Sequence, residues 1–247
     1  MSAQIRALLP PVELLIFDLD GTLIDSRQDL ANAVNATRTS MNLPPLDADL
    51  IASYVGDGAP VLIRRALGPE ASEDQIRQAL EYFLTYYSEH KLDFTRPYAG
   101  VPEALRRFAG AGIKMAVLTN KPVRISRAIL EGLDLARYFF AVYGGNSFEH
   151  KKPHPVGVET LCREAGVEPE HTLLVGDSGV DVRTARNAGI RACGVTYGFQ
   201  PETLTEDPPD LLVSSLAELA DLLGVPPVGA PSPGPDLQQQ MSLELDL

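Results

Sequence analysis

The sequence predicts an α/β protein, in which a doubly wound parallel sheet carries a helical domain inserted after its first strand. Three observations support this fold class. Short apolar segments alternate with amphipathic ones along most of the chain, and strands that alternate with helices pair in parallel through right-handed crossovers. Between residues 25 and 96 this alternation stops, and only helical patterns occur. Polar clusters follow several predicted strands, as in open sheets that bind ligands at the carboxyl edge.

The first predicted strand covers residues 14–20 and begins with a short apolar run. Glycines such as Gly112, Gly132 and Gly166 follow predicted helices, since glycine is a common helix stop. The other core elements are, in order, a helix over 101–111, a strand over 113–120, a helix over 122–131, a strand over 139–145, a helix over 156–165, a strand over 172–177, a helix over 180–187, and strands over 191–197 and 210–213.

The segment 25–96 has the pattern of a separate helical domain. Apolar side chains recur at helical spacing near its start, for example Leu30 and Val34, and Ser72 with Gln75 forms a capping-box pattern that begins a later helix. The end of the chain is rich in Pro, Gly and Gln, a composition typical of disorder. We therefore predict a core domain of residues 1–24 and 97–224, a helical domain of residues 25–96, and a disordered tail of residues 225–247.

The composition limits the partners of the protein. The 247-residue chain has a formal net charge of −12, so we expect neither nucleic acid nor an anionic membrane as a main partner. No apolar run approaches the roughly 20 residues that span a bilayer, and the N-terminus lacks a signal-peptide pattern. Two cysteines, Cys162 and Cys193, form no disulfide framework, which favours a reducing cytoplasm.

Four polar clusters follow predicted strands: Asp18 with Asp20, Thr119 with Asn120, Lys151 with Lys152, and Asp177 with Asp181. Because parallel strands share one carboxyl edge, we expect these clusters to meet in one crevice. Asp18 and Asp20 should lie on the same side of the strand, where their charges repel unless a cation separates them. Together with Asp177 they suit a hard cation, and Mg²⁺ fits best. Gly21 would allow backbone N–H groups to face an anion.

The stretches FDLDGTLIDS, LTNK, KKPHP and LVGDSGVD resemble, in this order, the four motifs of the haloacid dehalogenase-like (HAD) phosphatases. The resemblance covers roughly residues 12–215 and implies a Rossmann-like core and a phosphoaspartate mechanism. Asp18 would attack phosphorus, while Asp20 would protonate the leaving alkoxide and then deprotonate a water molecule. Thr119 would hydrogen-bond a phosphoryl oxygen, and Lys152 would pair with the phosphate and the nucleophile.

The same resemblance implies Mg²⁺ as the cofactor. Asp18, Asp177 and the backbone carbonyl of Asp20 would hold the ion, and Asp181 would support the metal shell. Asp177 taken alone has a second interpretation, because an aspartate that precedes a helix is usually an N-cap.

The inserted helical domain resembles the small cap that closes over the active site in this superfamily and selects substrates. Residues 54–68 look like the cap loop and helix of the phosphoglycolate phosphatases, which makes 2-phosphoglycolate, a small phosphorylated metabolite, the leading substrate. Gly21, Asn120 and Arg64 are the predicted substrate-binding residues. Arg64 and Arg65 have the alternative of a solvated helix face, which is the commoner place for such residues.

Several alternatives remain open. A sugar phosphomutase has the same catalytic groups but releases no net phosphate, and other HAD phosphatases act on sugar phosphates, nucleotides or pyrophosphate. A binding module would have no need for the second carboxylate, Asp20. Lys151 competes with Lys152, which we prefer because it directly precedes Pro153. The sequence is compatible with a monomer and with a homodimer.

Overall fold

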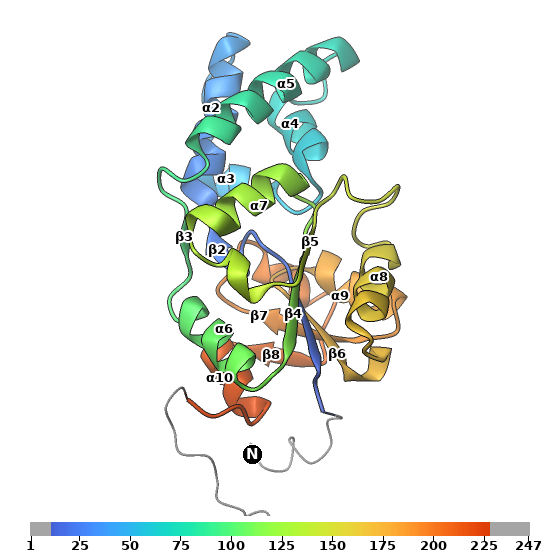
Figure 1. The fold of residues 1–247 in the computed structure, drawn as a ribbon. Helices are drawn as coiled ribbons and strands as arrows, with labels where there is room; N and C mark the ends of the chain where they lie inside the picture. The colour runs from blue at the N-terminus through green and yellow to red at the C-terminus, as the bar shows by residue number, and fades with distance from the viewer. Residues whose placement is uncertain (1–10, 228–247) are drawn as a thin grey trace, which may run out of the picture.

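The computed structural model describes residues 11–227 and centres on a six-stranded sheet in the order β5-β4-β1-β6-β7-β8 (Figure 1). Every neighbouring pair in this sheet is parallel, which confirms the predicted fold class. β1 lies in the interior of the sheet and is fully buried, as expected for a parallel strand covered on both faces. The strands are β1 (Leu14–Phe17), β4 (Lys114–Leu118), β5 (Ala141–Tyr143), β6 (Thr172–Gly176), β7 (Arg191–Val195) and β8 (Leu211–Val213).

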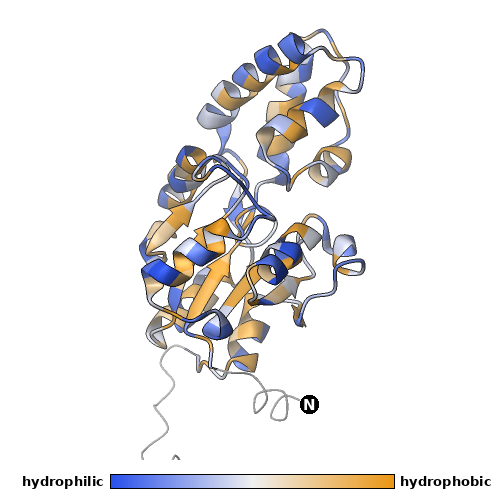
Figure 2. Ribbon diagram, turned by 90° about the vertical axis from the view of Figure 1, so that its right-hand side faces the viewer, coloured by the Kyte–Doolittle hydropathy of each residue, from blue (hydrophilic) through white to orange (hydrophobic). Residues whose placement is uncertain are grey.

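Helices cover both faces of the sheet, and the strands between them are the most hydrophobic part of the core (Figure 2). Because strand side chains alternate, Leu15 and Phe17 belong to one hydrophobic cluster and Leu14 and Ile16 to the other. The first cluster includes α6 (Val101–Gly110), α7 (Val123–Gly132) and α10 (Leu216–Leu222), and the second includes α8 (Val156–Ala165) and α9 (Gly179–Asn187). The short 3-10 helices are η1 (Ala136–Tyr138), η2 (Pro169–His171) and η3 (Pro201–Leu204).

The inserted domain contains four helices and lies beyond the carboxyl ends of the strands (Figure 1). We refer to it below as the cap. Its apolar side chains, such as Ile63 and Phe83, are buried where the helices pack on one another. The helices are α2 (Arg27–Ser40), α3 (Ala48–Ser53), α4 (Ala59–Leu67) and α5 (Glu73–His90). The predicted capping box is present, since Ser72 and Gln75 bond each other reciprocally at the start of α5.

Two connections between the cap and the core form a short antiparallel ribbon that the sequence did not predict. β2 (Ile24–Asp25) pairs with β3 (Arg96–Pro97), so the chain leaves and returns to the core at the same place. Two-residue strands are too short to show an alternating pattern, which explains why they were missed. The ribbon lies where we expected the linkers of the inserted domain.

The described chain continues beyond the predicted end of the core at residue 224. Val225 is buried in the first hydrophobic cluster, and Arg107 donates hydrogen bonds to the carbonyl oxygens of Val225 and Pro226. The rest of the predicted disordered tail, from residue 228 onward, lies outside the described residues. Within residues 11–227, no helix combines the length and the apolar character required to cross a membrane.

Candidate active site

A pocket lies between the carboxyl edge of the sheet and the cap. Its polar wall comes from the core and its apolar wall mainly from the cap. The core residues that line it include Asp18, Asp20, Thr119, Asn120, Lys121, Lys152, Asp177 and Ser178. The cap residues that line it are Leu30, Val55, Gly56, Gly58, Ala59, Leu62, Phe83, Leu84 and Tyr87. The structure therefore brings all four predicted polar clusters to one edge, although Lys151 and Asp181 are not in the pocket wall.

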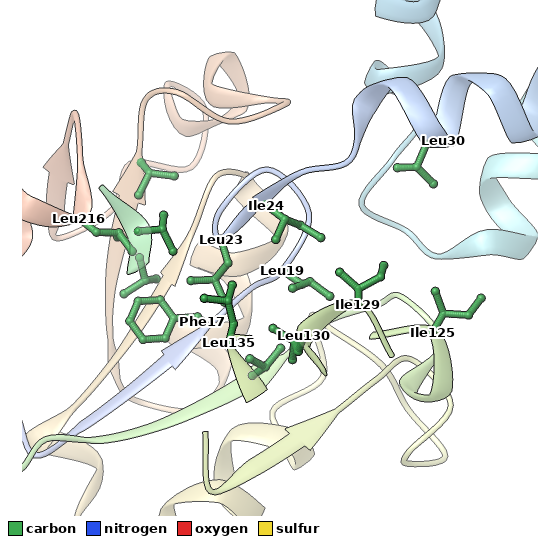
Figure 3. Close-up of a cluster of buried hydrophobic side chains, with 14 of the residues drawn as sticks. Phe17, Leu19, Leu23, Ile24, Leu30, Ile125, Ile129, Leu130, Leu135 and Leu216 are labelled. Atoms are coloured by element: carbon green, nitrogen blue, oxygen red, sulfur yellow. The ribbon is translucent and has the colours of Figure 1, made fainter. Parts of the chain in front are cut away.

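The loop after β1 presents two carboxylates because the residues around them are anchored in the core. Leu19 and Leu23 are fully buried, and Figure 3 shows them beside Phe17 and the side chains of α7. The carbonyl oxygen of Leu19 accepts hydrogen bonds from the N–H groups of Leu23 and Ile24, at 3.0 and 3.1 Å. β1 ends at Phe17, so both acids lie beyond the strand, whereas the sequence predicted them within it.

Gly21 has a steric role in this loop. Its φ of +82° belongs to the left-handed region, and a Cβ there would lie 2.2 Å from Asp177 Oδ2. Its N–H donates to the carbonyl oxygen of Ile24 at 3.0 Å. The turn itself uses this donor, so the N–H of Gly21 does not face an anion as expected; for the neighbouring N–H groups the expectation stays a prediction. Gly21 instead allows the close approach of Asp177 to the loop.

Lys152 is the cation next to Asp18. Its Nζ lies 2.9 Å from Asp18 Oδ1 and 2.6 Å from Asp181 Oδ1. Burial lowers the pKa of Lys152, but the two carboxylates outweigh it and raise the pKa above its usual value. Asp181 is also held by Ser178, whose N–H and hydroxyl both donate to its Oδ2. Lys151 instead donates to the carbonyl oxygen of Asp57 in the cap.

Three carboxylates form a compact buried cluster. One oxygen from each of Asp18, Asp177 and Asp181 lies within 4.8 Å of the other two. Burial raises the pKa of Asp18 to about 6, although Lys152 opposes the shift. Burial, followed by the charges of Asp181 and Asp18, raises the pKa of Asp177 to about 8. Such a cluster of hard oxygen donors fits a divalent cation such as Mg²⁺, which would relieve this repulsion. The carboxylate of Asp20 is not part of the cluster.

The buried charge of Asp177 predicts how the metal-free protein responds to pH. Between about pH 4 and pH 8 the folded state holds a proton on Asp177 that the unfolded state releases, so the free energy of unfolding falls as pH rises. We expect Asp177→Asn to raise the free energy of unfolding at pH 8 by more than about 1 kcal/mol in EDTA. Urea unfolding at pH 5 and pH 8 measures this. The control is Asp74→Asn on the exposed surface, and equal pH dependence of Asp177→Asn and wild type would contradict the account.

Asp20 is paired with a lysine that sequence analysis did not assign. Lys121 Nζ lies 3.0 and 2.9 Å from the two carboxylate oxygens of Asp20, and it donates to the hydroxyl of Tyr87 in the cap at 2.7 Å. Ser26 also donates to Asp20. Lys121 was visible in the LTNK stretch, but its partners are 101 residues and 34 residues away in sequence. No local pattern connects them.

Thr119 and Asn120 end β4 at the pocket. Thr119 Oγ1 accepts the N–H of Lys121 at 3.2 Å, which fixes the turn after the strand. The amide nitrogen of Asn120 donates to the carbonyl oxygens of Gly56 in the cap, at 2.8 Å, and of Lys152, at 3.0 Å. Asn120 thus joins the cap to two core loops. Its Oδ1 is buried and accepts no hydrogen bond within residues 11–227.

Arg64 does not reach the pocket, in contrast to its prediction as a substrate-binding residue. Its guanidinium pairs with both carboxylate oxygens of Glu73, at 2.7 and 2.8 Å, and its side chain is 53% exposed. The buried face of α4 is formed by Ala59, Leu62, Ile63 and Ala66, so Arg64 lies on the opposite, solvated side. Arg65 pairs with Asp57 and is likewise exposed.

Contacts across the pocket hold the cap against the core. Gln200, after β7, donates to the carbonyl oxygens of Ser53 and Val55, at 2.8 and 2.7 Å. Its neighbour Phe199 donates its N–H to Asp177 at 2.6 Å, so the loop that contacts the cap also fixes the acid cluster. Neither residue was predicted, since a loop without a charged motif carries no sequence signal.

Comparison with known proteins agrees with this geometry. A family model described as haloacid dehalogenase-like hydrolase matches residues 15–195. A phosphoglycolate phosphatase of Chromobacterium violaceum is 39% identical over 220 residues, covering 87% of this chain and 98% of that protein. One of Haemophilus influenzae (strain 86-028NP) is 38% identical over 219 residues, covering 85% of this chain and 98% of that protein.

Solved structures show the same fold. A crystal structure of a predicted phosphoglycolate phosphatase from Haemophilus somnus 129pt has a TM-score of 0.81 and 33% identity, covering 85% of this chain and 97% of that chain. A predicted phosphatase from Clostridium acetobutylicum has a TM-score of 0.77 and 25% identity, covering 86% of this chain and 98% of that chain. With the matched motifs, the parallel sheet and the cap, this chain belongs to the family of haloacid dehalogenase-like hydrolases.

Proposed function

We propose that this protein hydrolyses small phosphate monoesters, with 2-phosphoglycolate as the leading substrate, through a phosphoaspartate on Asp18 and with Mg²⁺ as cofactor. The observation that carries the proposal is the arrangement of Asp18 and Asp20 in one pocket, the first beside Lys152 and the acid cluster and the second beside Lys121. The choice of substrate rests on relatives that are named phosphoglycolate phosphatases. The proposed setting is the cytoplasm, with neither nucleic acid nor membrane as partner.

The first step forms the covalent intermediate. Asp18 attacks phosphorus with a carboxylate oxygen, and the bond from phosphorus to the ester oxygen breaks. Asp20 donates its proton to that oxygen, so the leaving group departs as an alcohol. Lys152, held at 2.9 Å from Asp18, orients the nucleophile and pairs with the negative phosphoryl group. Thr119, also in the pocket wall, would hydrogen-bond a phosphoryl oxygen.

The second step hydrolyses the intermediate. Asp20, now a carboxylate, removes a proton from a water molecule as the water oxygen attacks phosphorus. The bond from phosphorus to the Asp18 oxygen breaks, which releases inorganic phosphate and restores the Asp18 carboxylate. General acid–base catalysis provides only about 10²–10⁴-fold acceleration. The nucleophile and the electrostatic groups must supply the remainder of a barrier reduction on the order of 20 kcal/mol or more.

The acid cluster is the proposed Mg²⁺ site. Asp18 and Asp177 would hold the ion together with the backbone carbonyl of Asp20, and Asp181 would support them. When bound, Mg²⁺ supplies positive charge to the phosphoryl oxygens and to the carboxylate cluster. The carboxylates fit this role because one oxygen from each of Asp18, Asp177 and Asp181 lies within 4.8 Å of the other two, and burial followed by mutual repulsion raises the pKa of Asp177.

The proposal is tested by measuring phosphate release from a panel of monoesters. The panel contains 2-phosphoglycolate, sugar phosphates, nucleotides, pyrophosphate and an aryl phosphate, each with Mg²⁺ and with EDTA. We expect release in Mg²⁺ alone, with the highest kcat/KM for 2-phosphoglycolate. A higher kcat/KM for another member would change the substrate but retain the mechanism. Conversion of a sugar phosphate to its isomer without net phosphate release would identify a phosphomutase instead.

A further inference from the structure

We infer that Lys121 and Tyr87 together form a subsite that recognises a carboxylate on the leaving group of the substrate. This inference rests on the proposed function and adds the residues that select the substrate class. Lys121 comes from the turn after β4 in the core, and Tyr87 comes from α5 in the cap. The two side chains meet in the pocket, where Lys121 Nζ lies 2.7 Å from the hydroxyl of Tyr87.

The supply of positive charge in the pocket points to Lys121. Among the described residues that line the pocket, the only lysine or arginine side chains are Lys121 and Lys152. Lys152 is already paired with Asp18 and Asp181. The protein carries a formal net charge of −12, so a substrate with both a phosphate and a carboxylate needs a local cation near each of these two groups. Lys121 is paired with one carboxylate, Asp20, whereas Lys152 is paired with two, so we assign Lys121 to a group other than the phosphate.

The position of Lys121 limits how far the carboxylate can lie from the ester oxygen of the substrate. Its Nζ lies 2.9 and 3.0 Å from the oxygens of Asp20, the proposed proton donor to the ester oxygen. A group that contacts Lys121 is therefore only a few ångströms from that oxygen. A carboxylate separated from the ester oxygen by one carbon matches this spacing. Substrates whose carboxylate lies farther along the chain would place it against the apolar wall of the cap.

Tyr87 supplies the second donor. The hydroxyl oxygen of Tyr87 accepts a hydrogen bond from Lys121. The hydroxyl hydrogen is therefore free to donate, and it finds no acceptor within residues 11–227. The side chain is 1% exposed and lies against Phe83, with ring centroids 5.6 Å apart. Hydrogen bonds to a charged group are strong in such an apolar setting. The subsite is complete only when the cap lies over the core, because each element contributes one donor.

The test compares two substrates that differ in the carboxylate alone. We measure kcat/KM for 2-phosphoglycolate and for ethyl phosphate, in which a methyl group replaces the carboxylate. The preference is the ratio of the two values. Because Lys121 also contacts Asp20, its loss lowers both rates, and only the ratio reports recognition of the carboxylate. The variants are Lys121→Met and Tyr87→Phe, with Arg64→Met as a control that removes a cation outside the pocket.

We expect Lys121→Met to reduce the preference by about 10–100-fold and Tyr87→Phe by about 3–10-fold, with no change in Arg64→Met. If Lys121→Met does not fold, the preference of Tyr87→Phe tests the inference, since this variant loses only one hydroxyl. Glycolate should also inhibit ethyl phosphate hydrolysis more weakly in Tyr87→Phe than in wild type. Equal losses for both substrates in both variants, with wild type active on 2-phosphoglycolate, overturn this inference and leave the proposed function intact. Absence of phosphate release by wild type from any monoester overturns both.

Discussion

Asp18→Asn is expected to lower the rate of phosphate release by at least about 10⁴-fold, because the amide cannot attack phosphorus. The substitution preserves the size of the side chain and leaves the ion pair between Lys152 and Asp181, at 2.6 Å, in place. We therefore expect a folded protein without activity. Steady-state phosphate release with 2-phosphoglycolate and Mg²⁺ measures the loss.

The control for Asp18→Asn is the thermal melt of the variant, recorded with and without Mg²⁺. A cooperative transition near that of wild type would show that the lost activity is chemical and not a result of unfolding. An Asp18→Asn protein that retains more than about one hundredth of the wild-type rate would exclude Asp18 as the nucleophile.

Lys152→Met is expected to produce the largest effect on stability. Lys152 is the cation paired with the acid cluster, and its side chain is 3% exposed. Removing one partner of a buried ion pair leaves uncompensated charge, which costs about 3–5 kcal/mol. Urea unfolding in EDTA measures the change, and phosphate release should be abolished as well.

Lys151→Met provides the matched control for Lys152→Met. Lys151 is the neighbouring lysine, is exposed, and donates to the carbonyl oxygen of Asp57 in the cap. We expect its free energy of unfolding to change by less than about 1 kcal/mol. The double variant Lys152→Met with Asp181→Asn should recover part of the lost stability, since one of the unpaired charges is removed. Equal free energies of unfolding for Lys151→Met and Lys152→Met would contradict the stabilising role of Lys152.

Much of the fold was predictable because its strongest signals are local. The apolar run that begins at Leu14 forms the fully buried strand β1, and Gly166 caps the end of α8 in the left-handed conformation. The elements that were missed are short. α3 contains six residues, and the ribbon between the cap and the core contains two residues per strand. α10 was also missed, although its start carried a recognisable signal. Ser215 accepts the N–H of Glu218 in an ordinary N-cap pattern.

In the site, too, the residues of local motifs were predictable and their long-range contacts were not. The order of the motifs led to Asp18, Asp20, Lys152 and Asp177, which the fold brings together at one sheet edge. The surroundings of these residues were not predictable, because they depend on contacts between distant segments. Arg64 illustrates this: helical spacing shows that it lies on a helix, but only the packing of α4 shows that it faces solvent. Cap residues that reach the core, such as Tyr87, carry no pattern that reveals their partner.

Identification of the phosphorylated residue tests directly whether Asp18 is the nucleophile. Wild-type protein is mixed with 2-phosphoglycolate labelled in its phosphoryl group, in Mg²⁺, and quenched in acid within the first turnover. Peptide mapping then locates the label. We expect the label on Asp18, no label in EDTA, and no label in Asp18→Asn. Label on another side chain, or phosphate release by Asp18→Asn at the wild-type rate, would contradict this role of Asp18.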